Sequence, residues 1–128
     1  MMIRLPWYDN GDRLDVAIAA NAAARAGYSV FRVLADTSQF EKGDYLIDMP
    51  AADTLLKLGL SAQTCSPDPS LVTQQIVAPR IALLAGACSA YPYYGYYALA
   101  LLRLGYVFTI VDGEDIARGV LDTHDLLV

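Results

Sequence analysis

The sequence predicts an α/β fold with a mainly parallel sheet and flanking helices, of the flavodoxin-like kind. It leaves open a small α+β arrangement in the N-terminal half. Hydrophobic residues make up 55% of the chain and charged residues 18%, which suits a parallel sheet that is buried on both faces. A helix, a basic residue, a glycine and an apolar strand recur in that order at Gly27, Gly59 and Gly105. Helical crossovers of this kind favour parallel strands.

The N-terminal residues predict a strand, a helix and a hairpin. Ile3–Tyr8 is a short apolar piece that fits a strand, and Asp12 is a candidate N-cap for the helix that follows. Leu14–Ala26 has apolar residues at helical spacing and ends at a glycine, which tolerates the left-handed conformation there. Tyr28–Leu34 and Asp44–Met49 then predict two strands, paired as a hairpin.

The middle of the chain predicts a second short helix and a linker. Pro50 precedes a helix over 51–58, and Leu60–Cys65 fits a short strand. Ser66–Ser70 is rich in proline, serine and aspartate, which indicates a linker. We therefore expect a small α/β unit over 1–65, a linker over 66–79 and a second α/β domain over 80–128.

The stretch from Pro79 onward is the one around which the chain is organised. Ile81–Ala85 and Tyr106–Val111 predict two strands, joined by a helix from about Pro92 to Leu104. We expect these two strands to lie side by side and parallel. A short helix over Ile116–Gly119 and a last strand from Leu126 follow.

The segment Gly86-Ala87-Cys88-Ser89 is the first candidate site, because it lies where a strand turns toward a helix. Free N–H groups at a helix N-terminus bind anions and lower the pKa of a thiol. The segment could therefore form an anion pocket, or Cys88 could be a nucleophile with His124 or an acid as its base. A tight loop with a small buried thiol is the simpler interpretation, and it is favoured.

Five tyrosines crowd the predicted helix that follows: Tyr91, Tyr93, Tyr94, Tyr96 and Tyr97. Tyr93, Tyr97, Leu101 and Leu104 form one stripe at helical spacing, which is more often core than cofactor site. Five rings cannot all point inward, so we expect some to cover a partner surface, with simple half-exposure as the alternative.

Acidic side chains follow the second strand of this stretch. Asp112 and Glu114 could hold a ribose hydroxyl or another ligand at the strand end. Capping of the short helix by Asp112 or Asp115 is the favoured alternative. The ligand-binding prediction therefore comprises Gly86, Ala87, Cys88, Ser89, Tyr91, Asp112 and Glu114.

Charge and composition exclude several classes of function. The net charge of −5 argues against nucleic acid, and no apolar run approaches the ~20 residues of a membrane span. The sequence has one histidine, and its two cysteines form no metal-ligand motif. It therefore predicts no metal site and no cofactor. Free thiols are typical of a cytoplasmic protein.

Residues 80–128 resemble the opening of class I glutamine amidotransferase-like domains, in particular the N-terminal one of some biotin–protein ligases. The residues that carry the resemblance are Arg80–Leu84, Gly86, Leu99, Leu102, Gly105-Tyr106, Val111–Ile116, Gly119, Leu121 and Asp125–Val128. In that family a Pro-Gly-Gly loop and a later catalytic cysteine follow, and neither occurs in this chain. The resemblance implies a flavodoxin-like sheet and carries over no catalytic residue.

The N-terminal half resembles a segment of some bacterial zinc carboxypeptidase-like proteins, through Asn21, Ala26–Arg32, Gly43–Ile47 and Met49-Pro50. The initiating Met-Met and the end within a predicted strand lead us to expect a fragment of a longer protein.

Three functions fit these patterns. The first is a non-catalytic accessory or ligand-binding module that takes a small anionic ligand. The second is a cysteine-dependent hydrolase or amidotransferase-type enzyme that uses Cys88. The third is a structural domain that forms a homo-oligomer through the tyrosine-rich face or the final strand, because an open sheet edge invites pairing.

Overall fold

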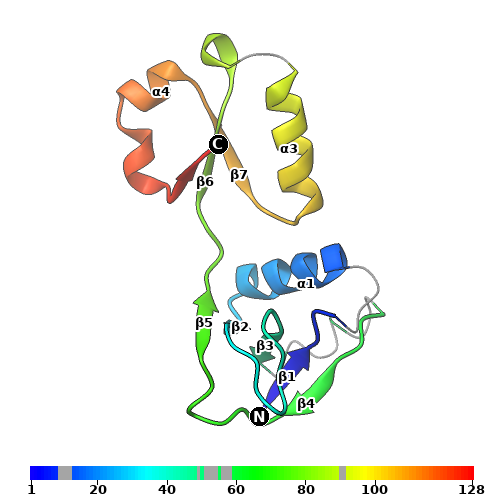
Figure 1. Cartoon of the computed structure of the whole chain (residues 1–128). Coiled ribbons are helices and arrows are strands. Elements are labelled where there is room, and N and C mark those ends of the chain that lie inside the picture. The colour runs from blue at the N-terminus through cyan, green and yellow to red at the C-terminus, as the bar shows by residue number, and fades with distance from the viewer. Residues whose placement is uncertain (9–12, 49, 51–54, 56–58, 90–91) are drawn as a thin grey trace. The chain divides into compact units, whose positions relative to one another are not determined.

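The chain folds as two compact units, Met1–Val77 and Ala78–Val128. The computed structural model describes residues 1–8, 13–48, 50, 55, 59–89 and 92–128. Figure 1 labels the elements along the chain. The segment expected as a linker, 66–79, contains a strand of the first unit. The predicted helix over 51–58 and the predicted cap Asp12 fall outside the described residues, apart from the buried Leu55.

The first unit is built on a five-stranded antiparallel sheet. Its strands lie in the order β4-β1-β3-β2-β5, and every neighbouring pair is antiparallel. Their bounds are β1 Met2–Leu5, β2 Val30–Val33, β3 Tyr45–Asp48, β4 Gln63–Cys65 and β5 Thr73–Ile76. The prediction of a mainly parallel, flavodoxin-like sheet is therefore wrong.

The reason lies in the hairpin between β2 and β3. The helix α1 (Arg13–Arg25) connects β1 to β2, and these two strands do run in the same direction, since each is antiparallel to β3. β3 turns back and inserts between them, which makes a split β-α-β arrangement. The crossover pattern thus predicts the direction of two strands but not the strand that separates them.

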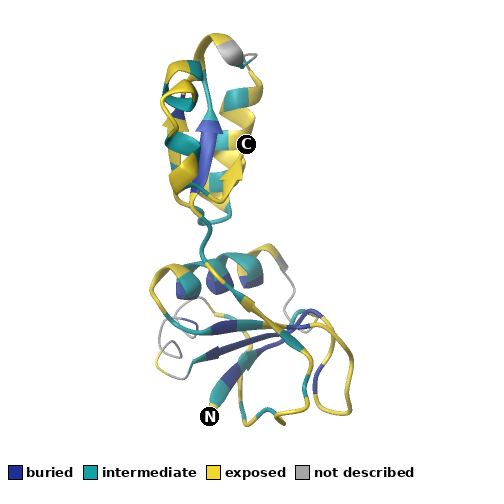
Figure 2. Cartoon of the chain, turned by 90° about the vertical axis from the view of Figure 1, so that its left-hand side faces the viewer, coloured by how far each residue is buried: buried dark blue, intermediate teal, exposed yellow. Residues whose placement is uncertain are grey.

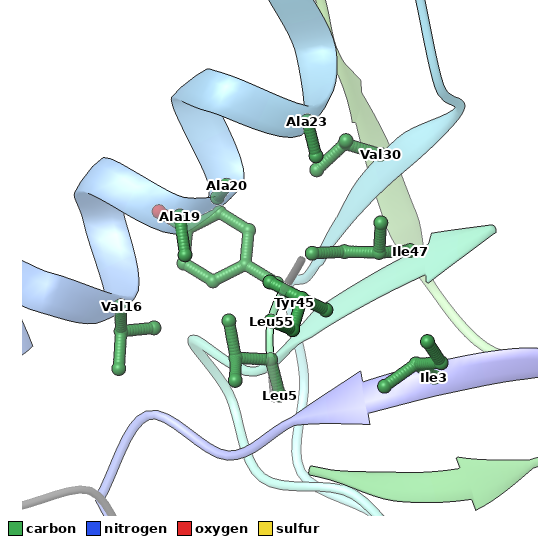
Figure 3. Packing of buried hydrophobic residues seen from close by; sticks show 10 residues of the cluster. All are labelled: Ile3, Leu5, Val16, Ala19, Ala20, Ala23, Val30, Tyr45, Ile47 and Leu55. Atoms are coloured by element: carbon green, nitrogen blue, oxygen red, sulfur yellow. The ribbon is translucent and has the colours of Figure 1, made fainter. Parts of the chain in front are cut away.

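The core of the first unit lies between α1 and one face of this sheet. Figure 3 shows the alanines of α1 above the strands, with the ring of Tyr45 beneath Ala19 and Ala20. Small side chains let the helix approach the sheet closely, and Val16, Ala19 and Ala20 are almost completely buried. The sheet side chains in this layer are Ile3, Leu5, Val30, Tyr45 and Ile47. Full burial of one such aliphatic side chain stabilises the fold by about 1.5–3 kcal/mol.

The opposite face of the sheet is covered by loops. Val33, Phe40 and Leu46 form a second buried cluster, with Met2, Phe31, Cys65 and Leu71 packed against it. Phe40 comes from the loop between β2 and β3, and Leu71 comes from the loop between β4 and β5.

The second unit has a small parallel sheet of three strands. β6 (Ile81–Leu84) is central, between β7 (Phe108–Val111) and β8 (Leu126–Leu127). Ile81 lies opposite Phe108 on one side and Leu126 on the other. The predicted parallel pairing of the first two strands, with a helix as crossover, is confirmed.

Helices lie on both sides of this small sheet. α3 (Tyr93–Arg103) connects β6 to β7, and α4 (Gly113–Ala117) with the 3-10 helix η3 (Val120–Thr123) connects β7 to β8. Figure 1 shows α3 and α4 on opposite sides of β6 and β7. Figure 2 shows β6 as the most deeply buried strand of this unit.

The predicted stripe of α3 is rotated in the structure. Tyr93 and Tyr97 are 61% and 52% exposed, whereas their neighbours Tyr94 and Ala98 are half-buried, as are Leu101 and Leu104 of the expected stripe. One residue along a helix turns the face by about 100°. The helix therefore packs on β6 with a stripe that is shifted by one residue in its first half and keeps Leu101 and Leu104 of the expected one.

Among the described helices, none is long and apolar enough to pass through a membrane.

Candidate functional site

The loops that follow β6 and β7 meet, as the strand-end prediction requires. The amide of Ala85 donates to the carbonyl of Val111 at 2.9 Å. Gly86 has a φ of +79°, and a Cβ there would lie 3.8 Å from the Cβ of Asp112. Gly86 and Asp112 are therefore neighbours, and glycine is required because other residues rarely adopt this conformation. Tyr91 and the side chain of Cys88 lie outside the described residues.

The turn after β6 differs from the expected helix N-terminus. Gly86–Cys88 form a single turn of 3-10 helix, η2, with no side-chain cap. The long helix α3 begins only at Tyr93, five residues beyond Cys88. One turn sums few peptide dipoles, and the field of a helix terminus is confined to its own first turn. The anion-binding argument for Gly86, Ala87, Cys88 and Ser89 therefore loses its main support.

Asp112 is committed to the structure of α4. Its carboxylate accepts from the amide of Asp115 at 2.9 Å, and the carboxylate of Asp115 accepts from the amide of Asp112 at 3.1 Å. This reciprocal pair is a capping box. The predicted capping role is confirmed, with the helix starting at Gly113, three residues earlier than expected. The hydrogen bond from the Asp112 amide lowers the pKa of Asp115, and Arg118 adds to the effect.

His124 contacts the turn before it, and its neighbour Asp125 holds the last strand in place. Nδ1 of His124 lies 2.9 Å from the carbonyl oxygen of Val120, within its own 3-10 turn. Asp125 accepts two side-chain hydrogen bonds from Arg80, at 2.8 and 3.1 Å, and one from the Arg80 amide at 2.8 Å. These bonds tie β8 to the start of β6. The predicted base His124 is thus engaged in a local contact.

The first unit carries two adjoining recesses that the sequence did not indicate. One has a volume of about 290 Å³, and the other about 200 Å³. Both are lined by Asp68 and Leu71. The larger one is also lined by Thr37–Phe40. The smaller one is also lined by Met2, Phe31 and Leu46 of the sheet.

The polar side chains that line these recesses form hydrogen bonds within their own loops. Asp68 accepts from the hydroxyl and the amide of Ser70 at 2.6 and 2.7 Å, and these bonds lower the pKa of Asp68. Thr37 accepts from the amides of Gln39 and Phe40. The proline-rich segment 66–70 that indicated a linker is one lip of the recess.

Comparison with known proteins adds no identity. No protein-family model matches the chain, and no curated protein or solved structure matches it. Within the part of the chain that the structure describes, no group of three or more histidine, cysteine, aspartate or glutamate side chains could hold a metal ion.

Proposed function

We propose that this chain is a non-catalytic accessory module that associates with a second copy of itself through helix α3. The observation that carries the proposal is the exposure of this helix. None of its residues is buried, and Tyr93, Tyr96 and Leu102 are 61%, 65% and 63% exposed. Exposed apolar side chains that form a contiguous patch mark interaction surfaces.

The second unit has few buried hydrophobic residues, so the apolar side chains of α3 stay largely exposed. Its buried hydrophobic residues, among those described, are Ile81, Ala82, Leu83 and Val111. Parallel sheets are normally enclosed on both faces, yet Ile110, Leu126 and Leu127 are also exposed. Association would remove part of this apolar surface from water, which is the main driving force of protein–protein binding.

The charge distribution supports a second copy as the partner. Each copy carries a net charge of −5, so two copies repel each other wherever their charged surfaces meet. Residues 81–102 contain no aspartate, glutamate, lysine or arginine. This stretch includes all of α3 except Arg103, so two acidic copies can meet here without burying an unpaired charge. Tyrosine is enriched at interface cores, where charged residues are depleted.

Three polar side chains of the second unit are engaged in structural contacts, which supports a non-catalytic role. Asp112 caps α4, Asp125 binds Arg80, and His124 contacts the turn before it. A module of this kind contributes binding rather than chemistry. Cys65 is a free thiol, and the proposal places the protein in the cytoplasm, where thiols stay reduced.

Sedimentation velocity over a range of concentrations tests the proposal. We expect the wild-type chain to sediment faster as its concentration rises. Tyr96→Glu places a charge at the centre of the exposed face and should raise the dimer Kd about thirtyfold, as loss of an interface hot spot does. Gln75→Glu adds the same charge to an exposed residue of the first unit and should leave the Kd unchanged. A wild-type chain that stays monomeric at high concentration would refute self-association.

A further inference from the structure

The guanidinium of Arg32 lies against two aromatic rings of the first unit. Its central carbon lies 5.6 Å from the ring centroid of Trp7 and 5.7 Å from that of Tyr45. The two rings are 6.2 Å apart and tilted by 58°. Tyr45 is directly opposite Arg32 in the sheet and is fixed beneath α1 (Figure 3). Cation–π contacts on two rings therefore restrict where this guanidinium can lie.

Arg32 contacts aromatic rings in place of an acidic partner, unlike three other arginines that the structure describes. Arg4 pairs with Asp44, Arg80 with Asp125 and Arg118 with Asp115. Among the described residues, Arg32 forms no ion pair and donates no side-chain hydrogen bond, although the chain has an excess of acids. Within the described residues, the N–H donors of this positioned arginine are therefore available to a ligand.

The three distances form a nearly equilateral triangle, so the two rings lie toward one side of the guanidinium and do not enclose it. The five N–H donors lie in the plane of the group and form a fork that matches carboxylate and phosphate oxygens. Arg32 is exposed, so a ligand in solvent can reach its side chain. Gln74, opposite Arg32 on the edge strand β5, brings an exposed amide to the same face of the sheet, where it can add a hydrogen bond.

We propose that Arg32, positioned by Trp7 and Tyr45, is a binding site for an oxyanion group, a carboxylate or a phosphate, of a small ligand. Contact with the two rings restricts the side chain before the ligand arrives, so binding loses less conformational freedom than it would at a free arginine. The site lies in the first unit and is independent of the α3 surface.

The only tryptophan of the chain is Trp7, so its fluorescence reports directly on this site. Titration of the purified full chain with sodium phosphate, and separately with sodium acetate, should change the Trp7 emission along a saturating curve. Sodium chloride at matched ionic strength should not. The stronger of the two oxyanions identifies the preferred group, and equal responses indicate a site that reads charge and fork geometry alone.

Variants separate the arginine from general charge effects. Arg32→Gln should weaken binding about tenfold or more, because a charge-assisted hydrogen bond is lost. Arg32→Lys keeps the charge but lacks the planar fork, and should bind with intermediate affinity. Arg103→Gln removes an exposed arginine of the other unit and should bind as the wild type does.

Two results would overturn the proposal. One is a titration curve that is the same in Arg32→Gln as in the wild type. The other is a chloride response equal to that of the oxyanions. The Nε–H resonance of Arg32, followed by NMR in the wild-type chain, gives a second readout that does not depend on a variant's folding. It should shift with phosphate or acetate, and an unmoved resonance contradicts the proposal.

Discussion

The Nε of Arg4 lies 2.6 Å from Oδ2 of Asp44, and the side chain of Asp44 is completely buried. The same carboxylate accepts from the amides of Trp7 and Glu41, both at 3.0 Å. Asp44 therefore joins β1, the chain after β1 and the loop before β3. A buried charge with this many partners holds its neighbours in one arrangement.

Asp44→Ala should strongly destabilise the first unit. It leaves Arg4 without its partner and two amides without their acceptor, and breaking a buried pair costs about 3–5 kcal/mol. Urea unfolding followed by Trp7 fluorescence measures the change, because Trp7 packs against this core. Glu41→Ala removes an exposed carboxylate from the same loop and should change the free energy of unfolding by less than about 0.5 kcal/mol. Equal effects of the two variants would contradict a structural role for the buried pair.

Long-range pairing explains what the sequence could not predict. Arg4 and Asp44 are 40 positions apart, and no local pattern connects them. The position of β3 is likewise not visible in its local sequence. Its insertion between β1 and β2 depends on which distant strands it pairs with. β5 escaped prediction because Thr73-Gln74-Gln75 is polar, which is tolerated at the edge of a sheet.

Local signals were predicted well. Gly27 ends α1 with a φ of +89°, and Ile81–Leu84 forms a strand at the expected residues. In the candidate site, the sequence predicted a cap at Asp112 or Asp115, and the structure has Asp112 as the cap and Asp115 as its partner in the capping box. The sequence missed the Trp7–Arg32–Tyr45 cluster, since only the sheet brings these three side chains together.

Asp112→Ala should loosen α4 through loss of its N-cap. Replacing an aspartate cap by alanine costs about 1 kcal/mol. The amide of Ile116, which donates to the Asp112 carbonyl, should then exchange with solvent faster, as measured by hydrogen exchange and NMR. Glu114→Ala changes an exposed carboxylate in the same turn, outside the capping box, and should leave exchange close to that of the wild type. If Glu114→Ala accelerated exchange as much, the cap would not be the cause.

The Arg80–Asp125 pair should make the attachment of β8 sensitive to acid. Hydrogen bonds from Arg80 lower the pKa of Asp125 from 3.8 to about 2. A carboxyl whose pKa is depressed in the folded state stabilises that state above its unfolded pKa. This contribution is lost as the pH falls from about 4 towards 2.

Hydrogen exchange of the Val128 amide, which donates to Ala82 at 2.9 Å, follows this attachment. Its protection, corrected for intrinsic exchange, should fall over that pH range in the wild type. Asp125→Asn should remove the pH dependence, and Asp122→Asn should retain it. A pH-independent wild type would contradict the assignment.

Cys65 should react slowly with iodoacetamide at neutral pH. Burial raises the pKa of its thiol above 9.0, although the charge of Arg4 opposes the shift, so little of the reactive thiolate is present. The Cys88→Ser variant isolates Cys65, and its rate should be below that of free cysteine until urea unfolds the chain. If the wild-type chain reacts faster than the Cys88→Ser variant, the additional reaction belongs to Cys88. Equal rates show that Cys88 is inert. A Cys88→Ser variant that reacts as fast folded as unfolded would show that burial does not protect Cys65.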